Sequence, residues 1–258
     1  ENWYTIFNPG NSNESIFEVN WDGNTYSQTG GPSAMYTTGT NPNYQYSTKM
    51  GEDLENDYEE VIAGKDAVRS WYGAFIALTD GENTVHCIWK YKMGDTDPTN
   101  LDAIRLKDDA NWIIYRMADV MLMKAEALIW KGKENWQEAV DIINQIRTRA
   151  NLLEKTIAID EEDESSMMEN YLLPERNIEL AAEGKRWYDM IRYAKSKNYA
   201  HKSAFIALVQ QYNTTANASW IRSVLQNEYA WYLPIHADEI ENNTLLVQNP
   251  YYGITGNN

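Results

Sequence analysis

The sequence has little cysteine and little histidine. Its 258 residues include 1 cysteine and 3 histidines. A single cysteine, Cys87, excludes an internal disulfide framework. The histidines His86, His201 and His236 are far apart in the sequence, and none belongs to an HExxH motif, so a zinc site has little support. We therefore expect no metal ion and no cofactor.

Positive charge and long apolar runs are also scarce. The chain has 22 Lys and Arg against 38 Asp and Glu, a formal net charge of -16. This argues against nucleic acid or an anionic membrane surface as a partner, because both require a cationic patch. No apolar run approaches the roughly 18 to 20 residues of a spanning helix. GxSxG, P-loop and GxGxxG motifs are absent, so we expect a protein that is not an enzyme.

The aromatic residues are mostly Trp and Tyr rather than Phe. The sequence has 4 Phe but 10 Trp and 18 Tyr. Trp and Tyr combine a flat apolar ring with a polar group, which suits partly exposed surfaces. The chain opens on Glu1 and shows no signal peptide, so we expect any export signal or membrane anchor to lie upstream.

Two regions differ in composition and together predict one compact unit. Residues 1–110 are rich in Asn, Gly, Thr, Ser and Tyr and are expected to be mostly loops, with strands at SIFEVNW (15–21) and VHCIWKYKM (85–93). Residues 111–258 are predicted to form helices followed by an extended tail. The expected fold class is mainly α, with long loops and a few short strands.

The first helices of this second region predict an antiparallel hairpin of tetratricopeptide kind. One helix is expected from Trp112 to about Lys131, with an apolar stripe of Ile114, Ala118, Met121, Ala125 and Leu128. After a turn over residues 131–134, Asn135 and Glu138 resemble a capping box. The second helix is expected to end near Ala150, with Trp136, Val140, Ile143 and Ile146 on its apolar face.

Later segments predict further helices and a surface loop. IDEEDESS (159–166) is interpreted as a solvated loop, with calcium binding as a minor alternative. A third helix is expected over residues 172–195, with Pro174 in its first turn and local loosening at Gly184. FIALVQQY (205–212) and SWIRSVLQNEY (219–229) are shorter helical candidates, and residues 231–252 are predicted to be an extended tail laid over the core.

Four charged residues of the predicted third helix have helical spacing. Arg176, Glu179, Glu183 and Arg186 would form one stripe of alternating pairs. Two of these carboxyl groups could instead serve as a glycosidase pair. A general acid needs a raised pKa, however, and neighbouring guanidinium groups lower it. The sequence therefore favours structural ion pairs over catalysis.

Four motifs together resemble the C-terminal region of the SusD/RagB family of surface nutrient-binding lipoproteins. They cover about residues 110–252. The motifs are YRMADVMLMKAEAL (115–128), AVDIINQIRTRANL (139–152), ERNIELAAEGKRWYDMIRY (175–193) and WYLPIHADEIENNTLLVQNPYY (231–252). In the tail, His236, Thr244 and Tyr251 depart from the usual Pro, Pro and Gly.

The resemblance implies a tetratricopeptide-like helical scaffold. The family's lipidated cysteine and most of its tetratricopeptide helices would lie in an N-terminal half that this sequence lacks. In such a scaffold the charged residues would hold helices and tail together. These residues are Arg116, Asp119, Glu126, Arg147, Arg149, Glu175, Arg176, Glu183 and Arg186.

The resemblance also implies a shallow glycan site formed by aromatic side chains of loops within residues 1–110. Sugar rings stack on Trp and Tyr, and their hydroxyl groups bond to amides and carboxylates. The expected stacking residues are Trp21, Tyr26, Tyr36, Tyr44, Tyr46, Trp71 and Tyr72, with Asn20, Asp22 and Asn24 as hydroxyl partners. The tryptophans on the predicted helices are expected to be core residues: Trp112, Trp130, Trp136 and Trp187.

The function implied is capture of an oligosaccharide or polysaccharide at the outer face of the outer membrane and its delivery to a SusC-like TonB-dependent transporter. The lipid anchor would belong to the part that this sequence lacks. A peptide or protein nutrient is an alternative ligand in the same scaffold. A helical adaptor that binds another protein is an alternative of a different class.

Overall fold

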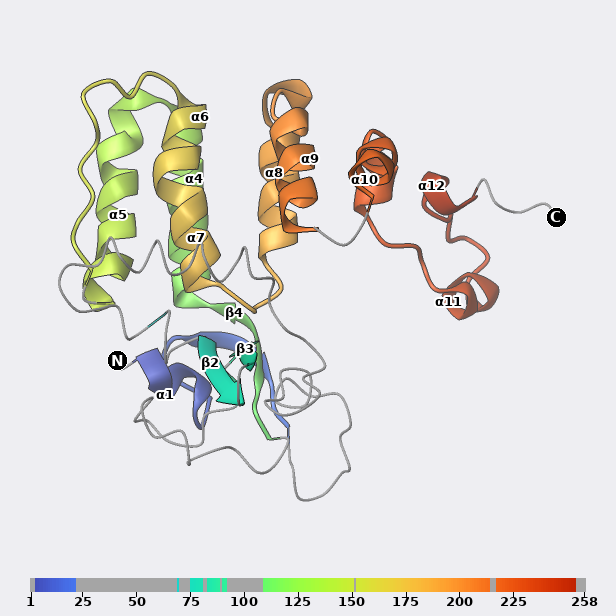
Figure 1. Cartoon of the computed structure of the whole chain (residues 1–258), viewed down its shortest axis with the longest axis horizontal. Helices are drawn as coiled ribbons and strands as arrows, with labels where there is room; N and C mark the ends of the chain where they lie inside the picture. The colour runs from blue at the N-terminus through green and yellow to red at the C-terminus, as the bar shows by residue number, and fades with distance from the viewer. Residues whose placement is uncertain are drawn as a thin grey trace. The chain divides into compact units, whose positions relative to one another are not determined.

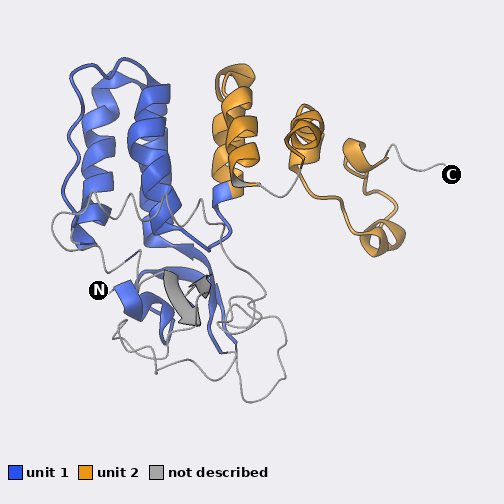
Figure 2. Cartoon of the chain, viewed as in Figure 1, with its two compact units in different colours: residues 1–186 blue, residues 187–258 orange. Residues whose placement is uncertain are grey.

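The structure, a computed structural model, describes residues 3–21, 69, 75–80, 83–88, 90–91, 109–150, 152–213 and 217–253; for residues 75–80, 83–88 and 212 it describes the backbone only. The chain forms two compact units, residues 1–186 and 187–258 (Figure 2). Each unit buries apolar side chains of its own. The fold is mainly helical with short strands, as the sequence predicts (Figure 1).

Two small antiparallel sheets and one short helix belong to the first unit. Strand β1 (Ser15–Val19) pairs with β4 (Trp112–Arg116), and β2 (Phe75–Asp80) pairs with β3 (Asn83–Ile88). The strands predicted at 15–21 and 85–93 are confirmed. The sequence reading missed β2 and the helix α1 (Trp3–Phe7), which buries most of its apolar side chains.

The prediction of a helix from Trp112 is wrong for its first five residues. This stretch, WIIYR, is rich in aromatic and β-branched side chains, which favour a strand. It pairs with β1, with Val19 opposite Trp112 and Phe17 opposite Tyr115. The pairing of β4 with β1, which lies more than 90 residues earlier in the chain, outweighs the helical spacing of the apolar residues. Helix α4 therefore begins only at Met117.

The predicted helical hairpin is confirmed, with shifted details. Helix α4 (Met117–Lys131) and helix α5 (Trp136–Arg149) are joined by a short 3-10 turn, η1 (Lys133–Asn135), and pack side by side (Figure 1). The expected core residues of α5 are buried. On α4, the sequence predicts Met121 in the core, but it is only half-buried, whereas Leu122 and Ile129 are fully buried. Asn135 makes no side-chain cap bond, because it ends the 3-10 turn in a helical conformation.

The acidic run is only partly a solvated loop. Asp163 caps helix α6 (Glu164–Met167) by accepting a hydrogen bond from the Ser166 backbone N–H at 2.8 Å. Glu161 is buried, and its carboxylate accepts a hydrogen bond from Asn170 at 2.8 Å. A π-helical segment, η2 (Met168–Leu172), then continues into helix α7 (Leu173–Glu179).

The predicted third helix is broken in the middle. Pro174 lies in the first turn of α7, as predicted, but α7 ends at Glu179 and α8 (Arg186–Tyr199) begins seven residues later. Between them, Ala182 and Gly184 have positive φ angles of 62° and 73°. A right-handed helix cannot continue through such residues, so the result is a complete break between α7 and α8 rather than a local loosening at Gly184.

The second unit consists mostly of short helices. α9 (Lys202–Tyr212), α10 (Ala218–Leu225) and the 3-10 turn η3 (Glu228–Trp231) follow α8 and confirm the two shorter helical predictions. Phe205 and Trp231 pack edge to face at a centroid distance of 4.9 Å in the core of this unit. The expectation that four tryptophans are core residues holds fully for Trp136; Trp112 and Trp130 are half-buried, and Trp187 is 38% exposed.

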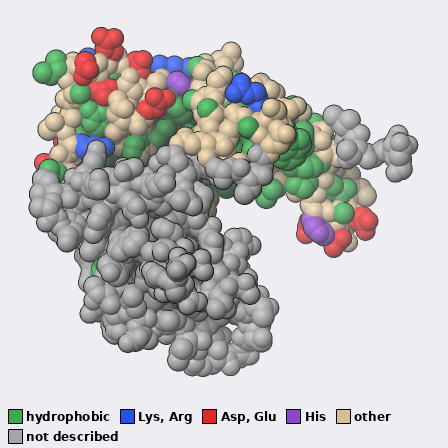
Figure 3. Space-filling model, in the orientation of Figure 1, with side chains coloured by type: hydrophobic (Ala, Val, Ile, Leu, Met, Phe, Trp, Pro, Cys, Tyr) green, Lys and Arg blue, Asp and Glu red, His purple; other side chains and the backbone are tan. Residues whose placement is uncertain are grey.

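The tail is not wholly extended, which corrects the sequence prediction. It contains the short helices α11 (Ala237–Asn242) and α12 (Pro250–Gly253). His236 caps α11 by accepting a hydrogen bond from the Asp238 backbone N–H. Acidic side chains gather over α11 (Figure 3). Three apolar tail side chains are more than 80% exposed rather than buried: Leu233, Leu245 and Val247.

Candidate functional site

The first sheet fixes the place where the expected ligand loop leaves the scaffold. Trp21 follows β1, and its backbone N–H donates to Asn111 Oδ1 at 3.2 Å. Asn111 Nδ2 in turn donates to Glu18 Oε1 at 2.7 Å. Trp21 is half-buried and Asn20 is exposed. In the described part of the chain, the buried indole N–H of Trp21 has no hydrogen-bond partner.

Most of the residues predicted to bind ligand lie outside the described residues. These are Asp22, Asn24, Tyr26, Tyr36, Tyr44, Tyr46, Trp71 and Tyr72. Of the ten predicted residues, Asn20 and Trp21 are the two that the structure describes. Their places in a common site therefore stay a prediction.

Arg69 lies two residues before Trp71 and is fully buried. Its Nη1 donates to Glu175 Oε1 at 2.5 Å and to Glu179 Oε2 at 2.8 Å, both on helix α7. These charge-assisted bonds connect Arg69, the first residue of the sequence RSWYG, to the helical scaffold. No local periodicity marks Arg69, and the sequence analysis did not identify it.

Lys90 makes a second connection between the N-terminal region and the scaffold. Its ammonium donates to Glu183 Oε1 at 2.6 Å and to the Ala181 carbonyl at 2.8 Å. The same nitrogen lies 5.3 Å from the ring centre of Trp3 and 4.6 Å from that of Phe7. Burial outweighs the attraction of Glu183 and lowers the pKa of Lys90 from its ordinary value.

Arg116, at the end of β4, joins the same cluster. Its Nε and Nη2 donate to Glu183 Oε2 and Oε1, each at 2.8 Å, in a bidentate pair. Its Nη1 bonds Glu179 at 2.7 Å and Glu14 at 2.6 Å. Arg149, from the end of α5, bonds both of these glutamates as well.

The result is a buried ion-pair network built around α7 and the turn after it. Glu179 alone accepts bonds from three guanidinium groups. The members of the network are Glu14, Arg69, Lys90, Arg116, Arg147, Arg149, Glu175, Glu179 and Glu183. Removing one partner of such a cluster leaves an uncompensated buried charge, so each member is expected to matter for the stability of the fold.

A second, smaller cluster surrounds Asp119 on α4. Arg176 Nη2 lies 2.9 Å from its Oδ1, and Lys185 Nζ lies 3.1 Å from its Oδ2. These cations outweigh burial, which by itself would raise the pKa of Asp119, and hold that pKa below its ordinary value.

The charged residues form ion pairs between helices and strands, as a scaffold role predicts, but the pairing predicted within the third helix is wrong. Arg176, Glu179, Glu183 and Arg186 do not form a stripe, because the helix ends at Glu179. Arg176 instead pairs with α4, and Glu179 pairs with β4, α5 and Arg69. Arg186 donates to the Leu173 carbonyl at 3.1 Å. The sequence identified the charges, but not their partners in distant segments.

The electrostatics of Glu179 and Glu183 argue against acid catalysis. Burial by itself would raise the pKa of each carboxyl group. The surrounding cations, Arg116 foremost, lower the pKa of Glu183, and they hold that of Glu179 well below its ordinary value. Both groups are therefore ionised near neutral pH. A glycosidase acid must hold a proton there, so neither group suits that role.

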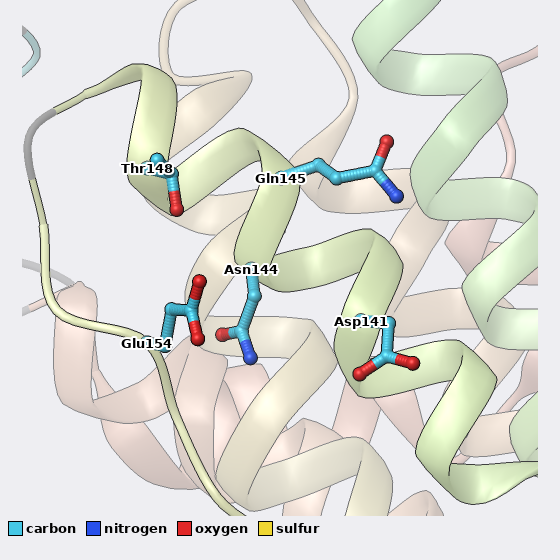
Figure 4. A pocket seen from close by; sticks show the side chains of 5 residues that line it. All are labelled: Asp141, Asn144, Gln145, Thr148 and Glu154. Atoms are coloured by element: carbon cyan, nitrogen blue, oxygen red, sulfur yellow. The ribbon is translucent and has the colours of Figure 1, made fainter.

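A polar pocket of about 480 Å³ lies along the outer face of α5. Its lining residues are Asp141, Asn144, Gln145 and Thr148 from the helix and Glu154 from the segment that follows (Figure 4). The amide of Asn144 is occupied by the backbone N–H and carbonyl of Lys155. No aromatic side chain belongs to this set, so it offers no surface on which a sugar ring could stack.

Within the described segments, no three His, Cys, Asp or Glu side chains are grouped so that they could hold a metal ion. None of the described helices is both long enough and apolar enough to cross a bilayer.

Comparison with known proteins identifies the fold. A family model described as the SusD family matches residues 76–252, more than half of the chain. The chain belongs to the SusD family. SusD-like protein P38 of Formosa agariphila is 40% identical over 96 residues, which are 34% of this chain and 18% of that protein. SusD-like protein P2 of the same organism is 32% identical over 152 residues, 57% of this chain and 27% of that protein.

Solved structures of SusD superfamily proteins have the same fold. A SusD superfamily protein from Bacteroides vulgatus matches with a TM-score of 0.64 and 23% identity, over 96% of this chain and 53% of that one. Surface glycan-binding protein A from Bacteroides uniformis matches with a TM-score of 0.58 and 20% identity, over 96% of this chain and 52% of that one. This SusD-family chain thus spans about half the length of the solved structures that it matches.

Proposed function

We propose that this SusD-family chain contributes to a cell-surface receptor that binds an oligosaccharide or polysaccharide without cleaving it. The observation that carries the proposal is the position of Arg69. A buried ion-pair network holds Arg69 two residues before Trp71 and three before Tyr72 in the sequence, in a family that has a glycan-binding protein among its structural relatives.

The physical chemistry of the first region supports a sugar ligand. Stacking on a sugar requires aromatic rings held on a rigid support, and hydroxyl groups require amide or carboxylate partners. The segment after β1 supplies tyrosines among asparagines, and the Asn111 bond to Trp21 fixes where that segment begins. A net charge of -16 is compatible with an uncharged ligand.

The proposal extends to the path of the ligand. A receptor that binds glycan without cleaving it must pass the intact chain on, and the SusD family model is the basis for naming a SusC-like TonB-dependent transporter as the recipient. The proposed location is the outer face of the outer membrane.

The test is calorimetric titration of the chain with starch, xylan, mannan and mucin-type glycans, with reducing ends assayed in the same samples. Saturable heat without new reducing ends is expected for one glycan class. The triple variant Trp21→Ala, Trp71→Ala, Tyr72→Ala should lose most of that heat. Trp220→Ala removes a tryptophan that is 64% exposed on α10 and serves as the matched control.

Two outcomes would contradict the proposal. New reducing ends, abolished by Glu179→Gln or Glu183→Gln, would indicate a hydrolase. Heat with a peptide mixture but with none of the glycans would indicate a receptor for peptides.

A further inference from the structure

The second unit presents a pair of exposed tyrosines at the C-terminal end of η3. Tyr229 is 55% exposed and Tyr232 is 39% exposed. Tyr229 lies in η3, and Tyr232 directly follows it in an extended conformation. The Tyr232 backbone N–H donates to the Tyr229 carbonyl at 3.4 Å, so the two residues lie at the two ends of one closed turn.

Trp231, next to Tyr232 in the chain, anchors the end of η3 in the core. It is 2% exposed, its indole N–H donates to the Leu225 carbonyl at 2.9 Å, and its own carbonyl accepts the indole N–H of Trp187 at 2.8 Å. The turn is thus held in the core by Trp231, while Tyr229 and Tyr232 remain exposed.

The backbone that carries the two tyrosines is held from the tail. Asn249 Nδ2 donates to the Tyr229 carbonyl at 2.9 Å and to the Tyr232 carbonyl at 3.1 Å. Gln248 Oε1 accepts a bond from the Ile235 backbone N–H at 2.9 Å, and Gln248 Nε2 donates to the Ile235 carbonyl at 2.8 Å. The position of the tyrosines is thus fixed before any ligand arrives, which reduces the entropy lost on binding.

Further aromatic rings lie close to the pair Tyr229 and Tyr232. Helix α12 packs on η3 and carries Tyr251 and Tyr252, which are half-buried and meet edge to face at 5.0 Å. Hydrophobic side chains, a class that includes tyrosine, are visible on the surface between α10 and α12 (Figure 3).

Three charged groups lie beside the tyrosine pair. Glu228, next to Tyr229 in the chain, pairs with Lys202 at 2.5 Å. Lys195 Nζ lies 3.2 Å from the Tyr232 hydroxyl oxygen but 5.6 Å from the ring centre, so it lies near the hydroxyl end of the ring. An ammonium group has three N–H donors, so Lys195 can also donate to a hydroxyl group of a neutral sugar beside Tyr232.

We propose that Tyr229 and Tyr232 form a second carbohydrate-stacking surface, which takes two successive rings of a neutral oligosaccharide, with Lys195 as a donor to a ring hydroxyl. This inference rests on the proposed function, since it assigns the same ligand class to a different part of the chain. Tyrosine suits the task because its apolar face stacks on the sugar while its hydroxyl group stays hydrated.

The experiment titrates the whole chain with maltohexaose, xylohexaose, cellohexaose and mannohexaose while tyrosine and tryptophan fluorescence is followed. The double variant Tyr229→Ala, Tyr232→Ala is compared with Tyr188→Ala, which removes a tyrosine that is 54% exposed on α8. The affinity for the bound hexaose should fall about tenfold in the double variant and stay unchanged in the control. Tyr229→Phe, Tyr232→Phe should restore most of the affinity, which a folding defect would not explain.

Three results would overturn the inference, and they separate it from the proposed function. Equal affinities of the double variant and the control would refute the second surface while leaving glycan binding intact. Binding that is lost only in the Trp21, Trp71 and Tyr72 variant would place all stacking in the first region. Absence of binding to every hexaose and every polysaccharide by the unaltered chain would refute both proposals.

Discussion

Arg69 and Glu179 form a buried ion pair across 110 positions of the chain, with Nη1 and Oε2 2.8 Å apart and both side chains fully buried. The pair joins the region expected to carry the ligand loops to the end of helix α7. The free energy of a buried pair depends on its remaining partners, because desolvation costs several kcal/mol for each ion. The stability of the scaffold and the position of Arg69, two residues before Trp71 in the sequence, are therefore coupled.

Arg69→Met is the first test of this coupling. It removes the charge, keeps much of the side-chain volume, and leaves Glu175 and Glu179 with one buried cation fewer. The free energy of unfolding should fall by about 3 kcal/mol, measured by urea unfolding of the chain. If Trp71 and Tyr72 bind glycan, the affinity should also fall at temperatures where the variant is folded.

The matched control for Arg69→Met is Lys124→Met. Lys124 pairs with Glu138 at 2.7 Å, but both side chains are more than half exposed. Such pairs contribute about 0.2 to 1 kcal/mol. A loss of stability in Lys124→Met as large as that in Arg69→Met would show that burial is not the source of the effect.

Acid should weaken the network through Glu179 and Glu183. Their pKa values in the folded chain lie below the ordinary value of 4.5, so the folded state binds protons less readily than the unfolded one. Their stabilising contribution is therefore fully present above about pH 4.5 and is lost as the pH falls below it. We expect the thermal midpoint to drop steeply in this range.

Glu179→Gln isolates this contribution to the pH dependence. The variant cannot lose a charge at position 179, so the difference in midpoint from the unaltered chain should shrink as the pH is lowered from 6 to 3. Scanning calorimetry at each pH measures this difference. A gap that stays constant over the whole range would contradict a depressed pKa at Glu179.

Gly10 should tolerate no side chain. Its φ angle is 90°, and a Cβ there would lie 2.7 Å from Asn111 Nδ2, the amide that bonds Glu18. Gly10→Ala should therefore lower the free energy of unfolding by about 1 to 3 kcal/mol and displace Asn111 from the Trp21 backbone N–H. Hydrogen exchange at Trp21 should become faster.

Gly253→Ala is the matched control for the glycine prediction. Nothing lies within 4 Å of the position where its Cβ would be. Its thermal midpoint and the exchange rate at Trp21 should both stay unchanged. Equal effects of the two glycine substitutions would mean that contact with Asn111 is not the reason why Gly10 cannot carry a side chain.

Sequence patterns predict the parts of this fold that depend on neighbouring residues. The spacing of Trp136, Val140, Ile143 and Ile146 identifies α5 because one helix face is buried along its whole length. The strand at Trp112–Arg116 escaped the same reasoning, since its pairing partner lies near residue 17. Local spacing likewise predicts that the third helix continues past Glu179, but the chain leaves the helix there, with positive φ angles at Ala182 and Gly184.

The candidate site is less predictable than the fold for a similar reason. Aromatic and amide composition indicates which loop segments suit a sugar. Arg69 and Lys90, which belong to the same N-terminal region of the sequence, bond to carboxylates 93 to 110 residues away. A single charged residue in a loop gives no signal of such a partner, because exposed and buried arginines look alike in sequence.

Glu183→Gln separates a scaffold role from a direct role in ligand chemistry. Glu183 is bonded by Lys90 and by two nitrogens of Arg116, so loss of its charge leaves these buried cations with less compensation. The free energy of unfolding should fall by about 3 kcal/mol. Where the chain is folded, calorimetry should give an unchanged affinity for glycan, and no reducing ends should form with either chain. An unchanged thermal midpoint together with lost glycan binding would reverse the interpretation, because Glu183 would then act on the ligand and not on the fold.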